Sequence, residues 1–163
     1  MKKIVLNLSV LALSLSVLAV DATGKYSGKL NLDFSELKKS IKEKAAKGTA
    51  EQKKQADQAI TMIDKQIGAM NASTIKLELK KDGTLTMAQT TGGKTENETG
   101  KWSVKGNVIK FTNLSAPNGG PKELTGTVSK DGKTLSFDLS NELKKQSKGT
   151  PTNAKGSLTF KKA

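Results

Sequence analysis

Apolar and polar residues alternate at every second position along most of the chain beyond Asn71. A period of two is typical of strands that bury one face. The alternating runs are separated by short segments built on Lys81-Asp82-Gly83, Lys105-Gly106-Asn107 and Lys130-Asp131-Gly132. Asp-Gly and Gly-Asn pairs supply the positive φ angles that tight hairpins require. The pattern therefore predicts strands joined by hairpins in an antiparallel meander.

The same alternation occurs near both termini, in Tyr26 to Leu32 and in Gly156 to Phe160. In total, about eight strands are predicted. An even-numbered meander with one apolar face leaves no exposed edge if its last strand pairs with its first. We therefore predict a mainly β fold, an eight-stranded antiparallel up-and-down barrel in which 153–163 pairs with 25–32. A two-sheet sandwich is the alternative.

A helical period interrupts the strands after the first one. Leu37, Ile41 and Ala45 recur every four residues, and a longer apolar stripe then comprises Ala56, Ala59, Ile60, Ile63, Ile67 and Met70. Asp33 with Glu36 and Thr49 with Gln52 are predicted capping boxes. We predict a two-helix insertion over 34–70 that rests on the domain's own core. A lid, or a helix on a membrane surface, is the alternative.

The predicted inward face of the strands is apolar and carries no charge. Its members are Tyr26, Leu30, Leu32, Ile75, Leu77, Leu79, Leu85, Met87, Trp102, Val104, Ile109, Phe111, Leu124, Val128, Leu135, Phe137, Leu139, Leu158 and Phe160. Gly28, Gly100, Gly126 and Gly156 share this face, where a glycine permits a sharp bend or leaves space. A barrel of eight strands either fills its lumen or holds one small ligand. We take Tyr26, Met87, Trp102, Phe111 and Phe137 as candidate ligand-binding residues of the lumen, with the helices over its mouth; a solid core is the alternative.

A short motif recurs at the start of two strands, as Gly24-Lys25-Tyr26 and Gly100-Lys101-Trp102. With the Asp-Gly and Gly-Asn turns, it resembles the small secreted lipocalin-like (calycin) β-barrel domains of bacteria. The resemblance covers roughly Thr74 to Leu139 and excludes the helical segment. It implies a barrel able to hold a hydrophobic small molecule, and it implies no catalysis.

The first 19 residues resemble a targeting signal. Lys2 and Lys3 precede an apolar stretch, Ile4 to Val17, and Val17-Leu18-Ala19 fits a signal-peptidase site. Val20-Asp21-Ala22 is a second candidate site, and a retained membrane anchor is the alternative. We expect a signal peptide over 1–19, one domain over 20–163 and an exported bacterial protein, periplasmic or secreted. The chain has no Cys, so export does not serve disulfide formation.

The chain is strongly basic, with a formal net charge of +13 that comes from 28 lysines and no arginine. Because nucleic-acid sites depend on arginine, we expect no specific nucleic-acid partner. The lysines are spread along the chain, so they form a solvated surface or contact an anionic envelope component. We expect a monomer that does not span the membrane after signal cleavage.

Catalytic chemistry has little support in this composition. The chain has no His and no Cys, which removes the common nucleophile systems and metal-ligand sets, so we predict no enzyme, no metal and no cofactor. Glu96 and Glu98 are expected to face solvent, and Asp82 and Asp131 are expected to be turn residues. The leading hypothesis is a non-enzymatic binding module for a small apolar or amphipathic ligand. The alternative is an envelope interaction protein that uses its Lys-rich surface and amphipathic helices on a protein partner or an anionic envelope polymer.

Overall fold

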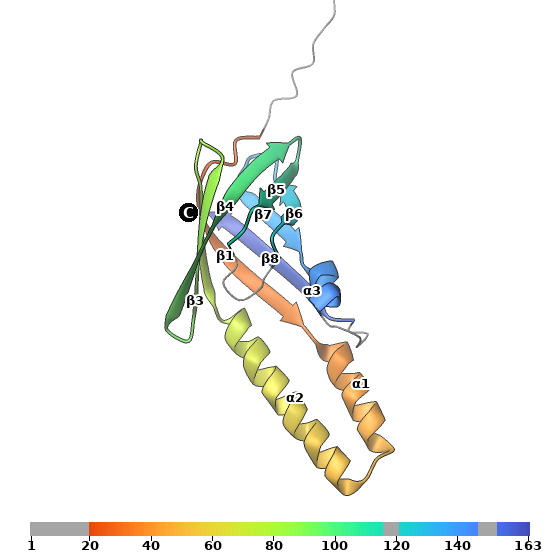
Figure 1. Ribbon diagram of the computed structural model, residues 1–163. Coiled ribbons are helices and arrows are strands. Elements are labelled where there is room, and N and C mark those ends of the chain that lie inside the picture. Colours follow the sequence, from red (N-terminus) through yellow and green to blue (C-terminus); the bar gives the residue numbers. More distant parts are fainter. Residues whose placement is uncertain (1–19, 116–120, 147–152) are drawn as a thin grey trace, which may run out of the picture.

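The structure is a computed structural model that describes residues 20–115, 121–146 and 153–163. Eight antiparallel strands form a closed barrel in simple sequential order (Figure 1). The elements are β1 (Gly24–Asp33), α1 (Ser35–Ala46), α2 (Ala50–Asn71), β2 (Thr74–Leu79), β3 (Thr84–Thr91), β4 (Lys94–Lys105), β5 (Val108–Thr112), β6 (Leu124–Val128), β7 (Thr134–Asp138), α3 (Ser140–Gln146) and β8 (Lys155–Lys162). The predicted mainly β barrel with two helices after the first strand is confirmed.

The barrel closes where the last strand meets the first. β1 pairs with β2 on one side, with Tyr26 opposite Leu77, and with β8 on the other, with Leu30 opposite Leu158. Every strand of the barrel has a paired neighbour on both sides, which confirms the predicted pairing of the terminal segments. The two-sheet sandwich is therefore excluded.

The hairpin turns have the predicted chemistry. Gly83, Gly106 and Gly132 adopt φ angles of 78°, 62° and 68°. The Asp82 carboxylate accepts a hydrogen bond from the backbone N–H of Thr84 at 2.9 Å, and Asp131 accepts one from Lys133 at 3.0 Å. Because strands alternate in direction, the β2–β3, β4–β5 and β6–β7 turns all lie at one end of the barrel. We call this the turn end.

The core fills the inside of the barrel. Its fully buried members include Tyr26, Leu77, Leu79, Leu85, Ile109, Phe111, Leu135, Phe137 and Phe160, all from the predicted inward face. Phe137 joins two other rings, with a centroid distance of 4.8 Å to Phe111 and an edge-to-face contact of 6.1 Å with Phe160. Such arrangements are favourable for aromatic pairs and fix the rings relative to each other.

The turn end is sealed by the segment that precedes β1. Ala22 is completely buried. Its carbonyl oxygen accepts a hydrogen bond from the Tyr26 hydroxyl at 2.7 Å, and the same hydroxyl lies 2.8 Å from the carbonyl oxygen of Gly132 in the β6–β7 turn. Tyr26 therefore ties the entering chain to the β6–β7 turn.

Helices α1 and α2 form an antiparallel hairpin that projects from the opposite end of the barrel (Figure 1). The predicted Thr49–Gln52 capping box is confirmed, and α1 ends at Ala46, just before Gly48. The Asp33–Glu36 box is wrong, because α1 begins at Ser35 after a Phe34 N-cap that makes no side-chain capping bond. Asp33 instead accepts from the backbone N–H of Ser35 at 2.8 Å.

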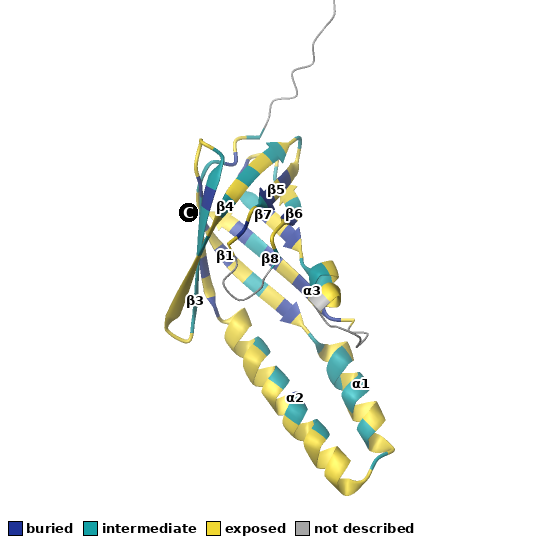
Figure 2. Ribbon diagram, viewed as in Figure 1, coloured by how far each residue is buried: buried dark blue, intermediate teal, exposed yellow. Residues whose placement is uncertain are grey.

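The expectation that the helices rest on the barrel core is also wrong. The two helices pack on each other, and Ile60 is their only buried residue among the described side chains. Figure 2 shows a hairpin that is mostly exposed, with partly buried positions along one side of each helix. The physical reason is that an apolar stripe requires a partner surface, and each helix here is the other's partner. The helices therefore project from this end of the barrel and do not lie across its mouth.

Candidate functional site

The five predicted lumen residues lie in the barrel in two different settings. Tyr26, Phe111 and Phe137 are 2%, 0% and 1% exposed and pack within the core. Met87 and Trp102 are partly buried against that core. Three of the five therefore contribute to the packed interior, and two have a surface that a ligand can reach.

The inward glycines receive neighbouring side chains. A Cβ atom added at Gly28 would lie 2.5 Å from Cε1 of Phe160, and one added at Gly126 would lie 2.6 Å from Cδ1 of Phe137. The same test at Gly156 meets Leu143 of α3 at 2.8 Å. The spaces beside these glycines are thus occupied by the protein's own rings and methyl groups, as in the solid-core interpretation.

Trp102 lies at the rim of the turn end. Its backbone N–H donates to the carbonyl oxygen of Gly83 at 2.8 Å, and its indole N–H donates to that of Lys80 at 2.9 Å. Both acceptors belong to the β2–β3 turn region. The side chain therefore packs on the core with one face and bridges to a lysine-bearing turn with its polar edge, as tryptophan often does at an interface.

A carboxylate lies on the inner wall of the barrel, contrary to the expected uncharged interior. Glu98 of β4 stands opposite Met87 of β3 and shares the inward register of Gly100 and Trp102. Burial raises the pKa of the Glu98 carboxyl, and the negative charge of Glu96 raises it further. The prediction that both glutamates face solvent is wrong for Glu98, which is only partly exposed.

No lysine neutralises Glu98 among the described residues, whose three ion pairs are Lys38–Asp64, Lys110–Glu123 and Lys145–Glu142. In a chain with 28 lysines, an inward carboxylate without an ion-pair partner is unusual. Near it, the inward positions of β3 turn polar at Gln89, which donates to the Ser73 hydroxyl at 3.3 Å. One side of the barrel interior therefore changes from an apolar to a polar, partly exposed wall.

A groove of about 510 Å³ crosses the outside of the barrel over β1, β2, β3 and β4. The outward side chains that line it are Lys25, Ser27, Lys76, Glu78, Thr86, Ala88, Asn97 and Thr99. Tyr26 and Leu77 also border the groove, and because their side chains are buried in the core, the groove meets them at their backbone. Met87 and Glu98 of the inward register line it as well, so the groove borders two of the predicted lumen residues, Tyr26 and Met87.

The helical hairpin is the largest feature outside the barrel, and its root is fixed to β1. The Asn71 side chain accepts a hydrogen bond from the backbone N–H of Leu32 at 2.8 Å and donates to the carbonyl oxygen of Leu32 at 3.1 Å. Ser73 adds a bond from its hydroxyl to the carbonyl oxygen of Met70 at 2.6 Å. These contacts hold α2 at a defined angle to the barrel.

The apolar stripe of the hairpin is incompletely covered. Leu37 and Ile41 of α1, and Ile63 and Ile67 of α2, all remain partly exposed, and Met70 at the end of the α2 stripe is 40% exposed. No helix among residues 20–115, 121–146 and 153–163 is long and apolar enough to cross a bilayer. Sequence periodicity identified the stripe, but it gave no information on which surface would cover it.

The fold defines the class of this protein as an eight-stranded closed antiparallel barrel with a projecting helical hairpin, an architecture compatible with a calycin-like barrel. Comparisons with protein-family models, with curated proteins and with solved structures found no match. Among the described residues, no group of three or more acidic, His or Cys side chains is placed to hold a metal ion.

Proposed function

We propose that this protein is an exported, non-enzymatic interaction protein whose helical hairpin binds a protein partner. The observation that carries the proposal is the incompletely covered apolar stripe on helices held away from the barrel. α1 and α2 have 12 and 22 residues, and Ile60 alone is buried. Two helices buried this little are marginal on their own, since helix stability in proteins comes mainly from packing.

The stripe has the spacing of a helix-binding surface. Ile60, Ile63 and Ile67 recur at three- and four-residue intervals on α2, and Leu37 and Ile41 recur at a four-residue interval on α1. Lys54, Gln58 and Lys65 are exposed on the other side of α2. An amphipathic segment of a partner, laid along the stripe, would bury these residues in the helix-in-groove mode.

The barrel supports this function as a rigid base. Its closed sheet and packed core leave little room for internal movement, and the two hydrogen bonds between Asn71 and Leu32 fix the hairpin's root. A partner therefore meets a helical surface of defined orientation, which lowers the entropy lost on binding.

Site-specific photo-crosslinking in envelope extracts of the native host tests this proposal. A crosslinking residue is placed at Ile63 on the stripe or, as a matched control, at Gln58 on the exposed opposite side of the same helix. We expect one discrete protein adduct from position 63, none from position 58, and loss of the adduct when Ile67 is replaced by Lys. Equal adducts at both positions, or none at either, would contradict the proposal.

A second candidate function is favoured by the inner wall at Met87 and Glu98. A partly exposed thioether beside a carboxylate without an ion-pair partner suits an amphipathic ligand that carries a cationic group, and the resemblance to lipocalin-like barrels points the same way. The test is titration of delipidated protein with a fluorescent long-chain amine and a matched fatty acid. Saturable binding of the amine with quenching of Trp102 supports this candidate, and mass spectrometry of molecules that co-purify would identify the ligand. Absence of saturable binding would rule it out.

A further inference from the structure

We propose that the turn end of the barrel is a docking surface for an anionic lipid bilayer. The turn end comprises the β2–β3, β4–β5 and β6–β7 turns together with the entering segment 20–23. This inference concerns the opposite end of the molecule from the hairpin and does not depend on the function proposed above.

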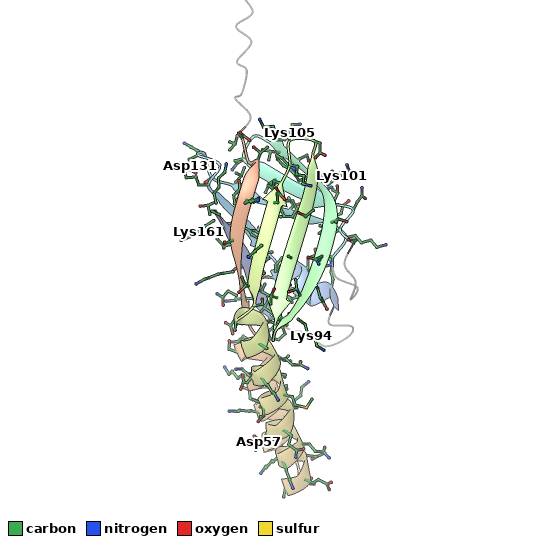
Figure 3. All side chains as sticks on the ribbon, turned by 90° about the vertical axis from the view of Figure 1, so that its left-hand side faces the viewer. Asp57, Lys94, Lys101, Lys105, Asp131 and Lys161 are labelled. Carbon is green, nitrogen blue, oxygen red and sulfur yellow. The ribbon has the colours of Figure 1, made fainter. Side chains whose placement is uncertain are left out.

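Lysines from four separate segments meet at the turn end. They are Lys80, Lys81, Lys101, Lys105, Lys130, Lys133 and Lys162, and every one of them is exposed. Figure 3 shows Lys101 and Lys105 at the end of the barrel away from the helices, with Asp131, whereas Lys94 lies at the end beside the helices. The repeated Lys-Asp-Gly turn motif thus becomes a cluster in space, because alternate hairpins of a meander share one end.

The carboxylates of the turn end are held against the protein's own backbone. Asp21 accepts from the backbone N–H of Thr23 at 2.9 Å, as Asp82 and Asp131 do from their own turns. None of the three is in an ion pair with a lysine among the described residues. Seven lysines against three aspartates leave a surplus of four positive charges, with the ammonium groups on the outside.

The other end of the barrel has a different balance of charge. Six acidic residues lie there, namely Asp33, Glu96, Glu98, Glu123, Asp138 and Glu142, against Lys29, Lys94, Lys122, Lys144, Lys145 and Lys155. The described part of the barrel is therefore electrically polar along its axis, with the positive surplus at the turn end. Lysines that approach an anionic membrane surface each strengthen binding.

A bilayer fits this end better than a linear polymer does. The lysines surround the rim of the barrel, so a plane can meet all of the turns at once. Two amphipathic or apolar side chains accompany them, since Trp102 is partly exposed at the rim and Val108, directly after the β4–β5 turn, is 44% exposed. Tryptophan at the boundary of water and lipid is a common anchor.

The path of the chain supports the same orientation. Val20 is the first described residue and continues into the turn end through Ala22. The apolar stretch Ile4 to Val17 stands only a few residues before it in the sequence. A leader engaged with the membrane before its cleavage would therefore bring the turn end to the lipid surface, with the hairpin pointing away from it.

Vesicle binding by the mature protein tests the proposal. The probes are vesicles of phosphatidylcholine alone or mixed with phosphatidylglycerol, each with a trace of dansyl-labelled lipid that accepts energy from Trp102, the only tryptophan. We expect binding to the anionic vesicles alone, loss of binding as salt is raised, and energy transfer from Trp102.

Matched charge variants locate the surface. Lys81→Gln, Lys105→Gln and Lys130→Gln together should weaken partition into anionic vesicles by on the order of 100-fold, since each lysine contributes about five-fold. Lys94→Gln, Lys122→Gln and Lys155→Gln carry the same net charge and should change it by less than about three-fold. An unchanged thermal melting curve for both triple variants shows that the barrel is intact.

Three results would overturn the proposal. One is equal weakening by the two triple variants, which would indicate diffuse charge. Another is vesicle binding without energy transfer from Trp102, which would indicate docking by a different face. The last is binding to soluble polyphosphate together with no binding to anionic vesicles, which would make the partner a polymer.

Discussion

Replacing Gly28 with Ala measures how tightly the barrel is filled. A Cβ atom at this position would lie 2.5 and 2.7 Å from Cε1 and Cδ1 of Phe160, and 3.1 Å from Cβ of Ile75. Real Cβ atoms do not approach other atoms to 2.5 Å, so the Phe160 ring must move. Phe160 is completely buried and packs edge-to-face on Phe137, so its movement disturbs a second ring.

We expect Gly28→Ala to lower the free energy of unfolding by about 1–3 kcal/mol, the usual penalty for one added carbon in a well-packed core. The assay is urea denaturation followed by Trp102 fluorescence, which reports on the barrel. Gly68→Ala is the matched control, because nothing lies within 4 Å of the added Cβ on α2. That control should stabilise the helix by about 0.5–1 kcal/mol, seen in the helical circular dichroism signal.

A double variant identifies the contact responsible. Phe160→Leu removes part of the ring that obstructs the new methyl group, so its penalty should be smaller in the Gly28→Ala background than in the native chain. If Gly28→Ala changes the free energy of unfolding by less than about 0.5 kcal/mol, the space beside Phe160 is open. In that case the interior has room for a ligand and our description of a filled core is wrong.

Further predictions concern ionisation and local stability. Burial, with a contribution from the Asp21 charge, raises the pKa of Tyr26 from 10.0 to about 12. At pH values below the unfolded pKa of 10.0, the neutral phenol therefore stabilises the fold by ~3 kcal/mol. This stabilisation is lost as the pH rises from 10 to 12. Tyrosinate absorbance of the only tyrosine checks it, and Tyr26→Phe should abolish that step. Because the pKa of Glu98 is raised, its charge opposes folding at neutral pH. Glu98→Gln should raise the urea midpoint at pH 7, and this gain should vanish at acidic pH, where the native carboxyl is protonated. An unchanged midpoint would mean that solvent stabilises the Glu98 charge. In hydrogen exchange, amides of α1 and α2 should exchange faster than those of β1 and β8, because the hairpin buries only Ile60. Equal protection would mean that the hairpin and the barrel open together.

The barrel could be predicted from the sequence because local signals agree with the global fold. Apolar residues at every second position, turn glycines and an even number of strands leave one economical arrangement, and Leu30 does pair with Leu158 to close it. The alternation and the turn glycines are local signals, and closure follows from the even number of strands. The barrel can therefore be predicted without knowledge of distant contacts.

The errors have identifiable physical causes. Glu98 lies two residues before Gly100 and four before Trp102, so the same alternation assigns it to the inner wall. It was misplaced because a charge was assumed to face solvent. Ala22 and Leu114 belong to the core but lie outside any periodic run, so the sequence carried no signal for their burial. The stripe on α2 indicated that the helix packs, but periodicity does not specify against what.

Because Ala22 seals the turn end, cleavage at the two predicted signal-peptidase sites would have different structural consequences. Cleavage after Ala19 retains the residue whose carbonyl oxygen the Tyr26 hydroxyl contacts. Cleavage after Ala22 would remove that acceptor and expose the turn end of the core to solvent. Of the two acceptors that the Tyr26 hydroxyl contacts, only the carbonyl oxygen of Gly132 would remain. Three residues at the N-terminus thus decide whether the turn end of the barrel is closed or open. The mass of the protein isolated from cells would show which form is present.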